Sequence, residues 1–160
     1  MKLLPGTLAA FLALAWAGGC GEEVETTPTA CLSGPKPIVE ALQAESTTAL
    51  IGGEVPLQDC LVREQPPGEL NTVGEAMITV ATQLNVTARE ADTRADRDDA
   101  AARLGYLLGA AEEAASETAG VHEDLIRRLN SAARFTEDGG TTSAAFERSY
   151  GAGYATARGG

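Results

Sequence analysis

The stretch "LNTVGEAMITVATQLNVTA", residues 70–88, has the clearest periodicity in the chain and decides the fold class. Its apolar side chains recur at intervals of three and four residues, a spacing that places them on one face of an α-helix. This face consists of Leu70, Val73, Met77, Val80, Ala81, Leu84 and Ala88. We therefore expect one amphipathic helix of about 20 residues. The preceding "PPG", residues 66–68, can start a helix but cannot continue one.

A second long helix is expected after the charged stretch "TAREADTRADRDD", residues 87–99. Thr93 and Asp96 have the spacing of a capping box, and acid in the first turn suits the helix dipole. The apolar face of this helix carries Leu104, Leu107, Leu108, Ala111 and Ala115. We expect the helix to bend or break at Gly120, with one bent helix preferred, after which "VHEDLIRRLNSAARF", residues 121–135, resumes the apolar stripe. The "DGG" at residues 138–140 is expected to end it.

Composition favours helices over sheets as the material of the core. Apolar residues make up 44% of the 160 residues, but aromatic residues only 4%, and alanine takes much of the apolar share. Alanine suits close packing of helix on helix, whereas sheets favour β-branched and aromatic side chains. The length leaves room for one domain. We expect an all-α fold, a small helical bundle with an N-terminal module.

The last segment, "TTSAAFERSYGAGYATARGG", residues 141–160, places three aromatic side chains four residues apart. Phe146, Tyr150 and Tyr154, here called the aromatic row, would share one face of a short helix that closes over the bundle. Such a row is usually part of a core. The alternative is a face that receives a partner or an apolar ligand.

The N-terminus reads as an export signal. Lys2 precedes an apolar run from Leu3 to Ala17, which is shorter than the ~20 residues of a spanning helix. The following Ala17-Gly18-Gly19-Cys20 resembles the lipobox of bacterial lipoproteins, although leucine is usual where Ala17 stands. That resemblance implies cleavage before Cys20 and acylation of its sulfur. Two alternatives are cleavage after the small-x-small triplet of residues 15–17, which would give a secreted soluble product, and an uncleaved anchor.

Cysteine parity favours the lipoprotein. The chain has three cysteines, and an exported protein meets an oxidising compartment. If Cys20 is acylated, Cys31 and Cys60 remain as one disulfide pair. In the chain-entropy model this pair, which closes a loop of about 30 residues, contributes about 3.6 kcal/mol. The disulfide would staple the N-terminal module, residues 31–65.

Within this module "PIVEALQAE", residues 37–45, predicts a short helix. The stretch "TTALIGGEVPLQ", residues 47–58, is compatible with a hairpin, but Pro56 lacks the donor that a ladder needs. We expect instead a loop at Gly52-Gly53 and a second short helix through Leu57, Cys60 and Leu61. The expected organisation is therefore a lipoprotein signal peptide at 1–19, a disordered tether at 20–30 and a single helical domain at 31–160.

The sequence carries no motif that predicts catalysis or a metal site. His122 is the only histidine, and Ile126 stands where a zinc-protease helix needs a second one. The acids clustered at the start of the second long helix lack the EF-hand pattern. A second acidic group on that helix, Glu112, Glu113 and Glu117, is typical of a solvated face. We expect no enzyme activity, no metal and no cofactor.

The net charge and the predicted location in the cell envelope leave two function classes open. The net charge is -11, or -12 once Lys2 leaves with the leader, so nucleic acid is excluded as a partner. The first class is a lipid-anchored, non-enzymatic component of the cell envelope that binds a protein partner or is structural. The second is a carrier of a small apolar or cationic ligand under a C-terminal aromatic lid. Either would lie on the membrane surface or in the periplasm.

Overall fold

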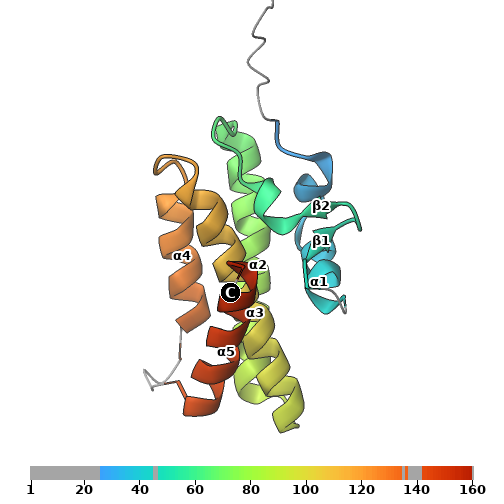
Figure 1. Cartoon of the computed structure of the whole chain (residues 1–160), viewed down its shortest axis with the longest axis vertical. Coiled ribbons are helices and arrows are strands. Elements are labelled where there is room, and N and C mark those ends of the chain that lie inside the picture. The colour runs from blue at the N-terminus through green and yellow to red at the C-terminus, as the bar shows by residue number, and fades with distance from the viewer. Residues whose placement is uncertain (1–25, 45–46, 135, 137–141, 160) are drawn as a thin grey trace, which may run out of the picture.

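The structure, a computed structural model, describes residues 26–44, 47–134, 136 and 142–159. The helices of this part are α1 (Pro35–Gln43), α2 (Pro67–Glu90), α3 (Arg94–Ser116), α4 (Glu123–Arg134) and α5 (Ala144–Ala157) (Figure 1). Shorter elements are the 3₁₀ helices η1 (Thr29–Leu32) and η2 (Leu57–Cys60) and the strands β1 (Leu50–Ile51) and β2 (Val55–Pro56). The expected all-α fold with a disulfide-stapled N-terminal module is confirmed.

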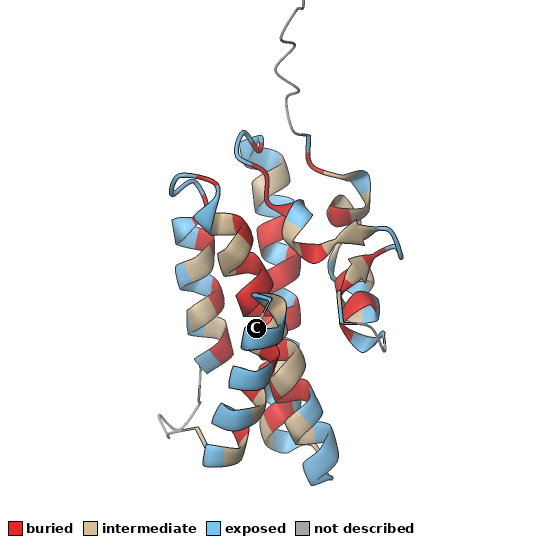
Figure 2. Ribbon diagram, in the orientation of Figure 1, coloured by how far each residue is buried: buried red, intermediate tan, exposed pale blue. Residues whose placement is uncertain are grey.

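The two long helices start where the sequence predicts. Pro67 is the first residue of α2, a position where its missing N–H costs nothing. Thr93 caps α3, because its hydroxyl accepts a hydrogen bond from the Asp96 amide at 3.1 Å. The apolar face of α2 is turned inward, with Val73, Met77 and Val80 fully buried. Figure 2 shows how the buried residues gather on the faces that the helices turn toward one another.

The expected bend at Gly120 is a complete reversal of the chain. Ala119 and Gly120 have φ angles of 53° and 87°, and two consecutive left-handed residues cannot continue a right-handed helix. The chain leaves α3 at Ser116 and returns as α4, which packs alongside α2 and α3 (Figure 1). The prediction of one bent helix is therefore wrong. Helix α4 ends at Arg134, and residues 138–140, expected to end it, lie outside the described residues.

The N-terminal module contains both α1 and η2 as short helices, but the loop predicted at Gly52-Gly53 is the turn of a hairpin. Strands β1 and β2 are antiparallel, and Leu50 lies opposite Pro56. The next ladder bond is donated by the amide of Leu57 to the carbonyl of Ala49 at 3.0 Å. In an antiparallel pair the bonded and non-bonded positions alternate, so no donor is required at Pro56.

The folded part begins before Cys31, inside the segment predicted as tether. Thr27 is buried, and η1 already starts at Thr29. The predicted signal peptide and the first residues of the predicted tether, up to residue 25, lie outside the described residues. Among the helices that the structure describes, none combines the length and the apolar content needed to cross a membrane.

Helices α3 and α5 touch backbone to backbone. A Cβ atom placed on Gly105 of α3 would lie 1.9 Å from the carbonyl oxygen of Tyr150 in α5. A Cβ on Gly153 of α5 would lie 1.8 Å from the carbonyl oxygen of Ala102 in α3. Both distances are far below van der Waals contact, so only glycine permits this crossing. The contact seats α5 against the buried leucines of α3 and completes the core.

Substitution of Gly153 by alanine tests this contact. The added methyl would overlap the α3 backbone and force the two helices apart, so we expect the free energy of unfolding to fall by about 3 kcal/mol or more. Urea denaturation of the variant, followed by circular dichroism, measures the loss.

Gly151 provides the matched control two residues earlier in the same helix. A Cβ there meets no described atom within 4 Å, so Gly151→Ala should stabilise the protein by about 0.5–1 kcal/mol through helix propensity alone. Equal effects of the two substitutions would contradict the close crossing of α3 and α5.

Candidate functional site

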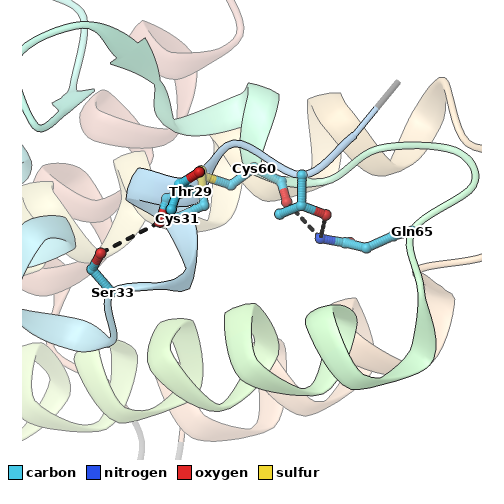
Figure 3. The surroundings of a disulfide bond; sticks show 6 residues. Thr29, Cys31, Ser33, Cys60 and Gln65 are labelled. Atoms are coloured by element: carbon cyan, nitrogen blue, oxygen red, sulfur yellow. Dashed lines mark hydrogen bonds between the residues drawn. A yellow bond between two sulfur atoms is a disulfide. The ribbon is translucent and has the colours of Figure 1, made fainter. Parts of the chain in front are cut away.

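Of the site residues that the sequence singles out, the structure brings Cys31 and Cys60 together. They form a disulfide with Cα atoms 5.5 Å apart, and both side chains are buried (Figure 3). The bond joins η1 to η2, and Gln65 lies beside it. Cys20, the predicted site of lipid attachment, lies outside the described residues. The predicted disulfide between Cys31 and Cys60 is confirmed.

A buried polar network connects the disulfide to the turn between α3 and α4. The side-chain nitrogen Nε2 of Gln65 donates to Thr27 Oγ1 at 2.9 Å and to the carbonyl oxygen of Cys60 at 3.0 Å. The other end of the same amide, Oε1, lies 3.1 Å from Nε2 of His122. Nδ1 of His122 lies 2.8 Å from the hydroxyl of Thr118. One glutamine thus ties the N-terminal module to the helical bundle.

These contacts determine where the neutral ring of His122 carries its hydrogen. Gln65 Oε1 only accepts, so the hydrogen of the neutral ring sits on Nε2. The Thr118 hydroxyl lies 2.8 Å from Nδ1 and also 2.8 Å from the carbonyl oxygen of Ala115, and these two acceptors share its single hydrogen. The imidazole is 0% exposed, and this burial lowers its pKa, because a charged ring would lose its hydration. His122 is therefore an enclosed histidine whose two ring nitrogens both contact polar side chains.

The aromatic row lies along α5, and its members stack on one another. Ring centroids are 5.8 Å apart for Phe146 and Tyr150, and 6.4 Å apart for Tyr150 and Tyr154. Phe146 and Tyr150 are only 7% and 9% exposed, and Tyr154 donates its hydroxyl hydrogen to Glu112. Burial raises the pKa of Tyr150 to about 12, so its hydroxyl stays protonated. Most of the row is packed within the bundle.

Phe146, at the start of the row, forms part of the wall of a cavity of about 410 Å³. The cavity lies where the end of α2, the start of α3 and the start of α5 meet. We call it the arginine cavity, because three of its wall residues are arginines. It is lined by Ala88, Arg89, Arg94, Arg97, Asp98, Thr142, Ser143, Ala145 and Phe146.

Arg89 is a half-buried cation of this cavity. Its Nε donates to Asn85 Oδ1 at 2.8 Å, and its guanidinium carbon lies 5.8 Å from the centre of the Phe146 ring. The Nη2 atom is buried and has no hydrogen-bond partner among the described residues. A buried donor without a partner is costly, and it needs an explanation in a native structure.

Arg97 and Arg94 complete the basic wall in two different ways. Arg97 is held in place, because its Nη1 donates to the carbonyl oxygen of Ala91 at the end of α2. Arg94 is 73% exposed, and its Nε lies 3.4 Å from the carboxylate of Asp98. The wall therefore carries three guanidinium groups against one carboxylate, and the local charge is positive although the chain is acidic.

The first turn of α5 adds a further positive contribution to this cavity. Ser143 caps the helix, accepting a hydrogen bond from the amide of Phe146 at 3.1 Å. Free amides and the helix dipole give a helix N-terminus a partial positive charge.

Arg89 also borders a second hollow, an open groove of about 850 Å³ between α2 and α4. Its floor includes Ile78 and Ala132, and Val86 on its wall is 46% exposed. Val86 and Val121 are the large apolar side chains most exposed in the described part of the chain.

The acidic clusters do not assemble into a metal site. Within the residues that the structure describes, no three side chains among histidine, cysteine, aspartate and glutamate converge on one point. Asp98 and Asp99 pair with arginines of their own helix, and Glu112 accepts from Asn130 at 3.0 Å and from Tyr154. These acids stabilise helices and join α3 to α4 and α5.

The sequence predicts neither the polar network around Gln65 and His122 nor the arginine cavity. Gln65 and His122 are separated by 57 residues, and Arg89 and Phe146 by the length of two helices. Each helix presents its own arginines as an ordinary solvated face. No local pattern indicates that they converge, because convergence depends on how α5 is seated.

Enclosure of His122 predicts that stability falls as the solution becomes acidic. In the unfolded chain the histidine has a pKa near 6.5 and binds a proton below that pH, whereas the folded protein resists protonation. The free energy of unfolding should therefore decrease by about 1 kcal/mol between pH 7.5 and pH 5.5. Urea denaturation across this range, monitored by circular dichroism, measures the dependence.

The His122→Gln variant is the control, since the chain has no other histidine. Whatever its stability relative to the parent protein, the slope of its stability against pH over the same range should be nearly flat. A variant that keeps the full slope would show that other groups cause the pH dependence.

Comparison with known proteins finds no relative: no protein-family model matches the chain, and neither a curated protein nor a solved structure matches it significantly. The function is therefore inferred from the residues and the geometry of the chain itself.

Proposed function

We propose that this chain is an exported lipoprotein of the cell envelope, held to a membrane through Cys20, and that its domain binds a partner or has a structural role. The observation that carries the proposal is the disulfide between Cys31 and Cys60. Stable disulfides belong to oxidising compartments outside the cytosol. With these two cysteines paired, Cys20 is the remaining thiol, and it stands where a lipobox places the acylated cysteine.

A binding or structural role is favoured over catalysis by the state of the ionisable side chains. His122 and Tyr150, whose pKa values are shifted chiefly by burial, are enclosed by packing and do not line the cavities described above. Tyr154, whose pKa is raised chiefly by its hydrogen bond to Glu112, does not line them either. A general acid or base must reach its substrate within hydrogen-bond distance. The groove between α2 and α4 and the arginine cavity offer surfaces for binding instead.

A carrier of a small ligand is the second candidate, and the arginine cavity favours it. The volume of about 410 Å³ lies within the range of small-molecule sites. Its three arginines repel a cationic ligand. The row of aromatic residues is for the most part core, so only Phe146 would contact the ligand of such a carrier.

The Cys20→Ser substitution tests the membrane anchor. Growth of the producing cells with labelled palmitate should label the parent protein and leave this variant unlabelled. The variant should also accumulate as unprocessed precursor, because lipoprotein cleavage follows acylation of the cysteine.

A variant with both Cys31→Ser and Cys60→Ser is the matched control. It loses the disulfide but keeps Cys20, and its labelling should equal that of the parent protein. Normal processing of Cys20→Ser, with release of soluble product, would rule out the anchor and favour secretion.

The binding role is tested separately, by chemical crosslinking in intact cells. One protein recovered in stoichiometric amount supports the first candidate, whereas a monomer without partners speaks against it.

A further inference from the structure

We infer that the arginine cavity is a binding site for a small organic oxyanion, a phosphate or carboxylate group carried on an aromatic or apolar body. The inference deepens the second proposed function, that of a ligand carrier. The donors and the aromatic wall, on which it mainly rests, do not depend on Cys20; the position of the cavity is argued from the proposed anchor. Three independent features of the cavity lead to it: its donors, its aromatic wall and its position in the molecule.

The donors match an oxyanion. Guanidinium groups present paired N–H donors that bind phosphate or carboxylate oxygens side by side. Arg94 extends into solvent, and its ion pair with Asp98 is long, with 3.4 Å between Nε and the carboxylate oxygen. Arg89 holds a buried nitrogen without a partner among the described residues. An anion in the cavity would lie among three guanidinium groups and offset their charge.

The arginines are also held in place for this task. Arg89 is fixed from one side by Asn85 and from the other by the face of Phe146. Arg97 is fixed by the end of α2 through the carbonyl oxygen of Ala91. Donors that are already ordered lose little side-chain entropy when a ligand binds.

The aromatic wall selects the body that carries the anion. Phe146 is part of the cavity wall together with Ala88 and Ala145, so apolar surface lies directly beside the charged groups. A ligand that combines an oxyanion with a ring or a short apolar group would contact both. A bare inorganic anion would contact only the donors, and it should bind more weakly.

The position of the cavity favours a ligand from solution over a lipid headgroup. The junction of α2 with α3 and the first turn of α5 lie at one end of the long axis (Figure 1). The first described residues, through which an N-terminal anchor would hold the domain, lie toward the other end (Figure 1). A domain hung from its N-terminus therefore presents this cavity away from the anchoring membrane.

Isothermal titration calorimetry of the full chain, in neutral detergent at low ionic strength, tests the inference. The probes are phenyl phosphate, phenylacetate, inorganic phosphate and benzyltrimethylammonium, a cation with the same ring. We expect one of the two aromatic anions to bind with 1:1 stoichiometry and inorganic phosphate to bind more weakly. The cation should not bind. Vesicles of phosphatidylglycerol test a lipid headgroup as the ligand. We expect the Arg94→Gln substitution to leave any binding to these vesicles unchanged.

Three variants connect the binding to the cavity. Arg94→Gln should weaken the bound anion about tenfold, whereas Arg127→Gln should leave it unchanged. Arg127 is a close match, since it is 75% exposed and pairs with Asp124 on its own helix, but it is not part of the cavity wall. Asp98→Asn removes the carboxylate from the cavity and should tighten binding about threefold.

Tighter binding by Asp98→Asn, in contrast to the weaker binding by Arg94→Gln, separates a real site from a damaged fold, because a loss of stability cannot increase affinity. The inference is overturned if neither aromatic anion binds at millimolar concentration, or if the cation binds equally well. Equal weakening by Arg94→Gln and Arg127→Gln would also overturn it, as would binding to the vesicles alone. A failed palmitate experiment would remove the anchor but leave these titrations valid.

Discussion

The backbone contact between α3 and α5 is the constraint on which the rest of the bundle depends. Helix α5 has only two large buried side chains, Phe146 and Tyr150, which is little apolar area for a helix that must stay attached. Gly105 and Gly153 compensate by letting the two backbones approach until main-chain atoms touch. Close approach multiplies dispersion contacts and allows weak Cα–H···O bonds between helices. The core is therefore closed by glycine as much as by apolar side chains.

The same contact positions the candidate site. Phe146 precedes Gly153 by seven residues, which is about two turns of helix, so the two residues share one face of α5. Rotation of α5 about its axis would drive Cβ atoms into the α3 backbone, and this fixes the direction in which Phe146 points. The ring is thereby brought to Arg89 from α2 and to the arginines at the start of α3. A packing constraint in the core thus forms the cavity at the end of the bundle.

Local patterns were sufficient to predict most of the helices, but not the hairpin or the arrangement of the elements. Periodicity identified α2, the Thr93 cap identified the start of α3, and cysteine parity identified the disulfide. Gly105 and Gly153, by contrast, read in sequence only as weak helix formers, because their value lies in a contact with a distant segment. The reversal at Gly120 and the hairpin at Pro56 likewise depend on single backbone positions that periodicity does not report. The arginine cavity inherits this limit, since its walls come from three helices.

The acidity of the chain and a basic cavity are compatible because they act over different distances. At physiological salt, exposed charges are screened beyond about 8 Å, so a small anion inside the cavity interacts mainly with the arginines and Asp98 that line it. A polyanion such as nucleic acid extends far outside the cavity and meets the acidic surface along its whole length. Net charge therefore disfavours large anions, whereas the local arrangement of Arg89, Arg94 and Arg97 favours the small anion that we propose. Selection by size would then follow from the electrostatics of the cavity and of the surface around it.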